Sequence, residues 1–493
     1  MRHRAGSGEA VVSKNISTPI CDFIRDYADS GISRFHMPGH KGADIMPLSY
    51  TYDITEVTGA DSLYEATGII AQSEQNASHL FGSGATFYSV EGSSHCIRAM
   101  LALAAQCPGA GSSGTASHPV ILAARNIHRS FLTAAALLDL DVAWLYPAFS
   151  YEGSYCTCPV TAEQIRRRLD AMDPLPAAVY LTSPDYLGHM QDIASIADVV
   201  HAYKIPLLVD NAHGAYLHFL EQPMHPVDLG ADMCCDSAHK TLPAMTGCAY
   251  LHISRSAAPR YAAFARNALA LFGSTSPSYL LMASLDQTNQ ILAGDFPKRL
   301  QTACNAATHL RSLFEADSPA PATCLTEPLK ITLRSRTFGM TGTDLADALR
   351  MQKIECEYAD TDCLVLMLSP CNTDRDLSRL HRALEQLAAQ GAALVADPCS
   401  MPGSAGICTS DISEPQRILS IRDACFSASE RLPVEEAAGR ICADPALACP
   451  PGIPIVICGE IITPQAVRIL KHYGRTHISV IASKGQRCGY FPA

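Results

Sequence analysis

Lys240 is the residue whose chemistry raises the first question about this sequence. It stands in the stretch CCDSAHKTLPAMTG, residues 234–247, among small and apolar residues and directly after His239. Most lysines are solvated surface charges. Only 17% of this chain is Asp, Glu, Lys or Arg, however, and a lysine removed from water has a lowered pKa and a nucleophilic amine. Such an amine forms Schiff bases with aldehydes, so the stretch indicates covalent catalysis.

Asp210 supplies a second chemical group at the end of the apolar run IPLLVD, residues 205–210. A carboxylate at the end of a buried strand costs free energy unless a cation or a hydrogen-bond donor meets it. A protonated pyridine nitrogen would be such a partner, and holding that proton makes pyridoxal phosphate an electron sink. The alternative is that Asp210 only caps the following helix.

Two further stretches could hold the phosphate and the ring of that cofactor. YSVEGSSHCIRAML places Ser93 and Ser94 at the start of an amphipathic helix, where backbone N–H groups bind anions, and Ser237 could add a hydroxyl. RNIHRS, residues 125–130, places His128 directly after a strand, in a position suited to stacking or proton transfer. Taken alone, a Gly-Ser turn is usually an N-cap, and a loop histidine is usually solvated.

The elements that must position these residues alternate between strand and helix. Five short apolar runs predict strands: VILAARN (120–126), VAWLYP (142–147), AAVYLTSP (177–184), IPLLVDNAH (205–213) and GCAYLHI (247–253). Helical segments such as TAEQIRRRLDAM separate them, which indicates an α/β fold with a mostly parallel sheet. Such sheets bind ligands at the carboxyl ends of their strands.

The length of 493 residues requires two or three domains. We expect an N-terminal arm over 1–45, a large cofactor-binding domain over 46–300, a small α/β domain over 301–396 and a C-terminal domain over 397–493. A long helical stretch at 279–315 leads into the small domain, and the segment 397–410, rich in Pro, Ser and Gly, predicts a linker.

Composition excludes several classes of function. A net charge of -11 argues against a nucleic-acid or anionic-membrane partner, and the apolar runs are shorter than a membrane span. The 20 cysteines contain no C-x-x-C pair and indicate reduced thiols of a cytoplasmic protein. Pro38-Gly39 between His36 and His40 makes a helical metal pair improbable, so we expect no metal. No nucleotide-binding glycine loop follows a strand.

The motifs together resemble the prokaryotic ornithine/lysine/arginine decarboxylase family. The likeness runs from about residue 18 to 485 through eight collinear motifs: FHMPGHKG, DITEVTGADSLYEATGII, RNIHRS, SPDYLG, VDNAHGAYLHF, GADMCCDSAHKTLPAMTG, STSPSYLLMASLD and CPPGIPIVICGE. The resemblance implies a pyridoxal-phosphate enzyme with the aspartate-aminotransferase fold, or fold type I. The absence of the receiver-like domain of the large inducible members makes it similar to the shorter, biosynthetic type.

The resemblance also implies a role for each matching residue. Lys240 would form the Schiff base, His239 would contact cofactor and substrate carboxylate, and Asp210 would pair with the pyridine nitrogen. The remaining cofactor contacts would come from His128, Ala212, His213, Ser93, Ser94 and Ser237, with Thr275 and Ser276 reaching the phosphate of a neighbouring subunit. The active unit would then be at least a homodimer.

The implied reaction is decarboxylation of a basic amino acid, with arginine to agmatine favoured over lysine to cadaverine or ornithine to putrescine. Another aminotransferase or lyase of this fold, or a silent binding protein, are the alternatives. Glu460 is our candidate for the distal cation of the substrate, against a surface glutamate that caps the next helix. The chain departs from the family at Glu91, where Asn is usual, at Asn211 in Asp-Asn-Ala-His, where Glu is common, and near Gly247, where Gln is frequent.

Overall fold

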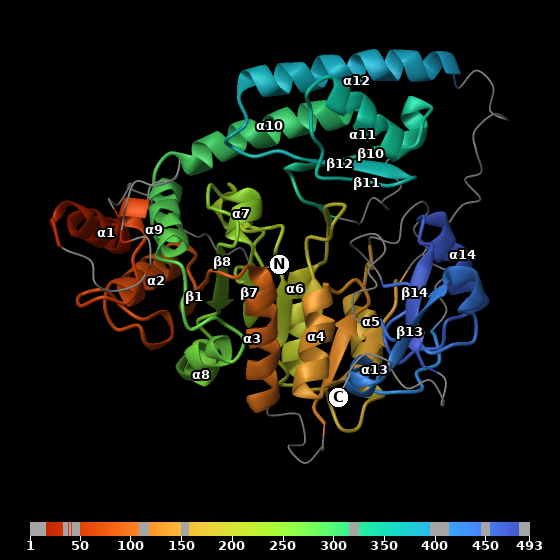
Figure 1. The fold of residues 1–493 in the computed structure, drawn as a ribbon, viewed down its shortest axis with the longest axis horizontal. Coiled ribbons are helices and arrows are strands. Elements are labelled where there is room, and N and C mark those ends of the chain that lie inside the picture. Colours follow the sequence, from red (N-terminus) through yellow and green to blue (C-terminus); the bar gives the residue numbers. More distant parts are fainter. Residues whose placement is uncertain are drawn as a thin grey trace, which may run out of the picture.

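The computed structural model describes residues 16–32, 38, 41, 50–107, 118–148, 157–314, 325–394, 414–444 and 454–482. These residues form a large α/β unit, a small unit above it and a third unit at its side (Figure 1). His36, His40 and the predicted linker at 397–410 lie outside the described residues.

A seven-stranded sheet forms the centre of the large unit, with the order β1-β8-β7-β6-β4-β2-β3. Every neighbouring pair is parallel except the two that involve β8, which runs antiparallel to both β1 and β7. The strands are β1 (Ala85–Ser89), β2 (Val120–Ala124), β3 (Asp141–Leu145), β4 (Ala178–Thr182), β6 (Leu207–Asp210), β7 (Met233–Asp236) and β8 (Ala249–Ile253). The prediction of a mostly parallel α/β sheet is therefore confirmed.

The five predicted strands all form, as β2, β3, β4, β6 and β8, but β7 was missed. Its sequence, Met-Cys-Cys-Asp, is short and ends in a charged residue, yet all four residues are buried. The missed strand is important because it runs directly into the segment that carries Lys240.

Helices cover both faces of this sheet, and those that follow its parallel strands start near the carboxyl ends of these strands. They include α2 (Ile69–Leu80), α3 (Ser93–Gln106), α4 (Arg129–Leu138), α5 (Ala162–Asp170), α6 (Ile193–Ala202), α7 (Ala238–Thr241) and α8 (Ala258–Ala270). Thr161 and Asp192 begin α5 and α6 as N-caps whose side chains accept backbone N–H bonds. At the N-terminal side, α1 (Pro19–Asp29) packs against α2 and against α9 (Tyr279–Ala293).

The helical stretch predicted at 279–315 is two helices, because Gly294 ends α9 before α10 (Phe296–Phe314) begins. The small unit that follows has the antiparallel order β10-β12-β11. Its elements are β10 (Lys330–Arg334), α11 (Gly342–Met351), β11 (Tyr358–Ala359), β12 (Cys363–Met367) and α12 (Asp374–Leu394). A short pair, β5 (His189–Met190) and β9 (Leu325–Thr326), joins the large unit to this region.

The third unit packs against the large sheet beside α4, α5 and α6 (Figure 1). It contains α13 (Ile421–Phe426), β13 (Ser429–Pro433), α14 (Pro464–His472) and β14 (His477–Ile481), and the two strands pair in antiparallel fashion.

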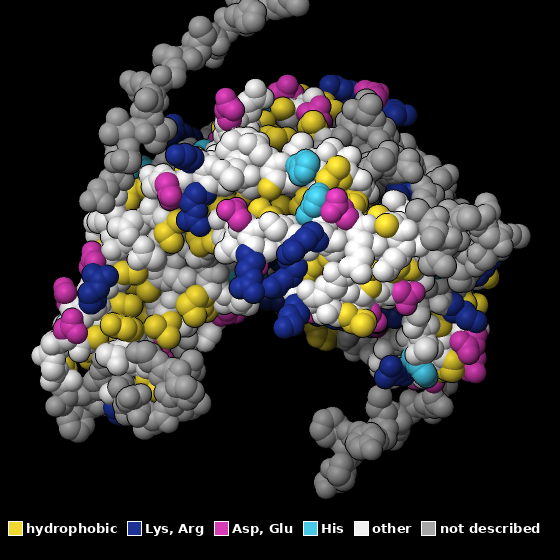
Figure 2. Space-filling view, turned by 90° about the horizontal axis from the view of Figure 1, so that it is seen from above, with side chains coloured by type: hydrophobic (Ala, Val, Ile, Leu, Met, Phe, Trp, Pro, Cys, Tyr) yellow, Lys and Arg dark blue, Asp and Glu magenta, His cyan; other side chains and the backbone are white. Residues whose placement is uncertain are grey.

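The surface drawn in Figure 2 carries charges of both signs. Basic side chains gather beside a hollow near its middle, and acidic and basic side chains are interspersed over the rest. None of the helices in the described ranges combines the length and the apolar run that crossing a bilayer requires.

Candidate active site

Lys240 lies in α7, which follows directly on β7 and begins after Ser237. The lysine is half-buried, and its Nζ lies 3.0 Å from Nε2 of His213. Removal from water lowers the pKa of Lys240, although the negative charge of Asp210 acts in the opposite direction. A lowered pKa leaves more of the amine unprotonated, which is the form that attacks an aldehyde.

His213 is buried beside Lys240. Burial, followed by the positive charges of Lys330 and Lys240, lowers the pKa of His213 well below its ordinary value, so the ring is neutral at pH 7. Its Nδ1 is buried and has no hydrogen-bond partner among the described residues. A buried, unpaired ring nitrogen of this kind is suited to a ligand atom.

Asp210 is the last residue of β6, the strand that pairs with β7, and its side chain is buried. Its carboxylate accepts hydrogen bonds from the backbone N–H of Ala212 at 3.1 Å and from the Tyr180 hydroxyl at 3.3 Å. The Cys235 thiol donates to the same carboxylate at 3.6 Å. All three partners are neutral, and no ion pair joins Asp210 to a cation in the described part of the chain. The carboxylate therefore faces the site without the cation that burial calls for.

The phosphate turn predicted at Glu91–Ser94 begins α3. Gly92 has φ +73°, a conformation that favours glycine, and no side chain caps the helix. The Ser237 hydroxyl donates to the Ser93 hydroxyl at 2.7 Å, so the structure brings two of the predicted phosphate ligands together from different elements. Ser94 is half-buried on the next position of α3. A fourteen-residue helix with free N–H groups and two hydroxyls can bind an anion.

His128 and His239 stand near this group but are held by different contacts. His128 is the N-cap of α4 and accepts the N–H of Ser130 at Nδ1, so its ring proton is on Nε2. Burial lowers the pKa of His128, and the negative charge of Asp210 acts in the opposite direction. His239 uses Nδ1 to donate to the Cys248 carbonyl at 3.0 Å. Stacking on a cofactor ring by His128 stays a prediction.

Thr275 and Ser276 are exposed on the loop before α9. The loop is tied to the phosphate turn of its own chain, because the Ser274 N–H donates to Oε1 of Glu91 at 2.6 Å. The carboxylate of Glu91 is thus directed to a backbone donor on this loop. This contact gives the departure at Glu91 a local role.

Gly247, the third departure, packs against the same turn. It has φ +100°, and its carbonyl accepts the Gly92 N–H at 2.8 Å. A Cβ at this position would lie 3.1 Å from the Val90 carbonyl oxygen. Close packing of two backbones therefore requires glycine here.

Both sequence interpretations of Glu460 need correction. The residue is buried rather than a surface cap, and α14 is capped by Thr463 instead. Its two carboxylate oxygens each lie 2.6 Å from a guanidinium nitrogen of Arg125. Since this internal cation already pairs with Glu460, the motive for assigning it to the distal group of a substrate is lost.

The sequence interpretation missed Lys330, Tyr186 and Glu357. Lys330, on β10, is buried, donates to the Asp185 carbonyl at 2.8 Å and lies 5.7 Å above the Tyr186 ring. Tyr186 contacts the His213 ring edge-on at 5.1 Å, and its hydroxyl donates to Glu357 at 2.8 Å. Tyr186 stands in the motif SPDYLG, but no motif marks Lys330 or Glu357, because only the fold brings the small unit to Lys240.

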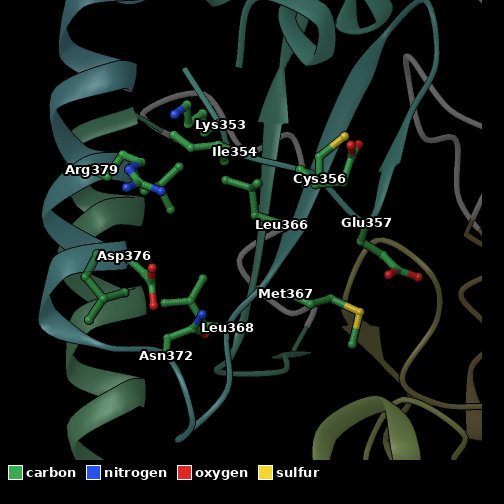
Figure 3. A pocket seen from close by; sticks show the side chains of 13 residues that line it. Lys353, Ile354, Cys356, Glu357, Leu366, Met367, Leu368, Asn372, Asp376 and Arg379 are labelled. Atoms are coloured by element: carbon green, nitrogen blue, oxygen red, sulfur yellow. The ribbon is translucent and has the colours of Figure 1, made fainter. Parts of the chain in front are cut away.

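A separate cavity of about 340 Å³ lies within the small unit (Figure 3). Figure 3 shows Lys353, Arg379 and Asp376 around the apolar side chains of Leu366 and Leu368, while Glu357 extends away from them. The lining includes neither Lys240 nor Asp210, so this cavity is not the site described above.

The arrangement fits pyridoxal phosphate. It offers a desolvated amine, a buried carboxylate that lacks a cation and a helix N-terminus with two hydroxyls, all at the carboxyl edge of one sheet. Lys240 would bind the aldehyde, Asp210 the ring nitrogen, and Ser93, Ser94 and Ser237 the phosphate. Ala212 and His213 follow Asp210 on the turn beneath.

Comparisons with known sequences agree with this geometry. Residues 18–332 match the family model described as Orn/Lys/Arg decarboxylase, major domain, and residues 419–477 match its C-terminal domain. An uncharacterized protein of Bacillus subtilis is 31% identical, with 94% of this chain and 96% of that protein covered. The arginine decarboxylase of the same organism is 29% identical, with coverages of 91% and 92%.

Solved structures show the same fold. The lysine decarboxylase of Francisella novicida superposes with a TM-score of 0.73 at 18% identity, covering 95% of this chain and 82% of its own. The constitutive lysine decarboxylase of Escherichia coli gives 0.71 at 18% identity, with the same coverages.

Proposed function

Because the chain belongs to the Orn/Lys/Arg decarboxylase family of pyridoxal-phosphate-dependent enzymes, we propose that it removes the α-carboxyl group of arginine and releases agmatine and carbon dioxide. Lysine and ornithine are the other basic amino acids that the family description includes. The preference for arginine rests on the Bacillus relatives of similar length that carry this name. We further propose a cytoplasmic homodimer that serves polyamine metabolism.

The observation that carries this proposal is the pairing of a desolvated Lys240 with a buried, uncompensated Asp210 on adjacent strand ends. When bound, the cofactor supplies an electron sink for the electron pair left by the departing carboxyl group. Asp210 keeps a proton on the ring nitrogen, which keeps that sink strong. Lys240 accepts and returns protons near the substrate Cα. The neutral His213 ring lies 3.0 Å from Nζ of Lys240 and forms a hydrogen bond with this amine.

The experiment is product identification with the purified protein. The protein is loaded with pyridoxal phosphate and then incubated with arginine, lysine or ornithine in separate reactions. The amine and the carbon dioxide formed in each reaction are quantified. We expect agmatine from arginine to form with the highest kcat/KM. Formation of a keto acid in place of carbon dioxide would instead indicate an aminotransferase, and absence of any product from the three substrates would overturn the proposal.

A further inference from the structure

A buried hydrogen-bond network surrounds Asp236, the last residue of β7 and the neighbour of Ser237. Asn211 donates from Nδ2 to Oδ1 of Asp236 at 2.7 Å. Two histidines donate from Nε2 to Oδ2, His225 at 3.0 Å and His252 at 3.2 Å. The four side chains are fully buried and come from the ends of β6 and β7, from β8 and from the loop before β7.

The network is a set of hydrogen bonds and not a metal centre, although His225, Cys234 and Asp236 lie within ligand distance of one another. Nδ1 of His225 accepts the Val227 N–H at 3.3 Å, so the proton is on Nε2, which faces Asp236. A metal needs a lone pair at that nitrogen. Burial raises the pKa of the Cys234 thiol well above its ordinary value, which favours the protonated thiol in the metal-free network.

Asp236 is the anion that this network is built around. Burial alone would raise its pKa, but the charges and hydrogen bonds of His225 and His252 outweigh burial and hold the pKa well below its ordinary value. The carboxylate is therefore ionised at neutral pH and accepts from all three donors. Every donor that faces it must keep an N–H group in place.

Asn211 links this anion to the cofactor turn. Its backbone N–H donates to the Cys235 carbonyl at 3.0 Å, and its carbonyl accepts the Gly214 N–H at 2.8 Å. With the side chain bound to Asp236, Asn211 is fixed on both sides. The turn it fixes carries Ala212 and His213, next to Asp210.

The residue type at 211 follows from Asp236. An aspartate at position 211 would place a carboxylate at hydrogen-bond distance from the ionised Asp236. Two carboxylates so close cannot both ionise without a large cost. An amide removes the repulsion and adds a donor, so the departure at 211 complements the aspartate at 236.

We propose that Asn211 and Asp236 form a positioning pair that fixes the turn carrying Ala212 and His213 against the strand end carrying Ser237 and Lys240. The pair acts through these residues and does not itself touch cofactor or substrate. The inference rests on the proposed function only in that pyridoxal phosphate binds between the two elements.

A double-mutant cycle of isosteric changes tests the pair. Asn211→Asp creates two facing carboxylates, Asp236→Asn removes the anion, and the double variant exchanges amide and carboxylate. In the double variant the amide at 236 can donate to the new carboxylate, while its remaining oxygen still accepts from His225 and His252. Pyridoxal phosphate affinity is measured by absorbance titration, and unfolding of the cofactor-free proteins is measured by circular dichroism.

We expect Asn211→Asp to weaken cofactor affinity at least tenfold and the double variant to recover at least tenfold relative to it. Asn289→Asp is the matched control. Asn289 is a buried amide that donates to the Tyr88 hydroxyl at 2.7 Å, so this change should lower thermal stability and leave cofactor affinity within twofold.

Additive losses in the double variant would overturn the pairing, and so would unchanged cofactor affinity in Asn211→Asp. Should Asn211→Asp fail to fold, folding of the double variant counts as rescue, and a double variant no better than either single change contradicts the proposal. The cycle reads cofactor affinity, so a wild-type protein that binds the cofactor but decarboxylates no basic amino acid would refute the proposed function and leave this test intact.

Discussion

Arg125 and Glu460 form a fully buried, bidentate ion pair, although they lie 335 positions apart in the sequence. Arg125 follows β2 and precedes His128 by three residues, and it also lies over the rings of Trp144 and Tyr146. Glu460 belongs to the third unit, where it additionally accepts the Ile457 N–H at 2.8 Å. The pair therefore fastens the loop of His128 to that unit.

We expect Glu460→Gln to destabilise the protein rather than to change substrate selectivity. Removal of one partner leaves a buried guanidinium without its anion, which typically costs about 3–5 kcal/mol. Urea unfolding measures the loss. Glu163→Gln, which breaks an exposed pair with Arg167, should change stability by less than about 0.5 kcal/mol. Unchanged stability together with a raised KM would restore the substrate role of Glu460.

The error at Glu460 shows what the sequence could and could not predict. Nothing in the sequence around Glu460 identified Arg125 as its partner. Contacts between distant segments depend on how the units pack, and the same limit hid Lys330 and Glu357. The strands and the residues at their carboxyl ends were predictable because parallel strands bring their ends to one edge of a sheet. Asp210 was identified in this way, whereas Lys240 was identified from its small, apolar surroundings because β7 was missed, and His213 was placed with them by the family resemblance.

We expect Lys240→Ala to lower kcat by at least about 10³-fold, because it removes both the nucleophile and a proton-transfer group. Borohydride reduction should attach pyridoxal phosphate covalently to the wild-type peptide that contains Lys240 and leave the variant unlabelled. Circular dichroism should show an unchanged fold. Lys298→Ala, a change on the exposed side of α10, serves as the control with normal labelling. Full activity of Lys240→Ala would refute its assignment.

We expect Asp210→Asn to retain cofactor but to lower kcat by about 10²- to 10⁴-fold. An amide can still accept the Ala212 N–H, so the turn should remain in place. It cannot hold a proton on a ring nitrogen, however, because it carries no negative charge. Steady-state kinetics and an absorbance titration separate the two effects. Asp192→Asn, which exchanges one good N-cap of α6 for another, should keep wild-type kcat.

Subunit mixing can test whether Thr275 and Ser276 act on a neighbouring site. We expect a Thr275→Ala/Ser276→Ala protein and a Lys240→Ala protein to be nearly inactive alone. Mixed dimers should regain about a quarter to a half of wild-type activity, because one site then combines an intact Lys240 with an intact partner loop. Sedimentation checks that the mixed dimers form. Activity of the first variant equal to wild type would show that the loop does not contribute.

The last prediction concerns the pH dependence of stability through Lys330. Burial lowers the pKa of Lys330 to about 8, while its ordinary value is 10.5. Between these two values the unfolded chain binds more protons than the folded protein, so the free energy of unfolding rises with pH through this window. The contribution of Lys330 is lost as the pH falls through about 8, and its full size is about 3 kcal/mol.

Lys330→Met should abolish this rise. We expect the free energy of unfolding of wild type minus that of the variant to increase by about 1–3 kcal/mol from pH 7 to pH 10, measured by urea unfolding at each pH. Subtraction removes the titration of the shared groups that do not interact with Lys330. Lys298→Met, at the exposed position on α10, should give a difference that is flat over the same range. A flat difference for Lys330→Met would mean that Lys330 keeps an ordinary pKa and is more solvated than its position over the Tyr186 ring implies.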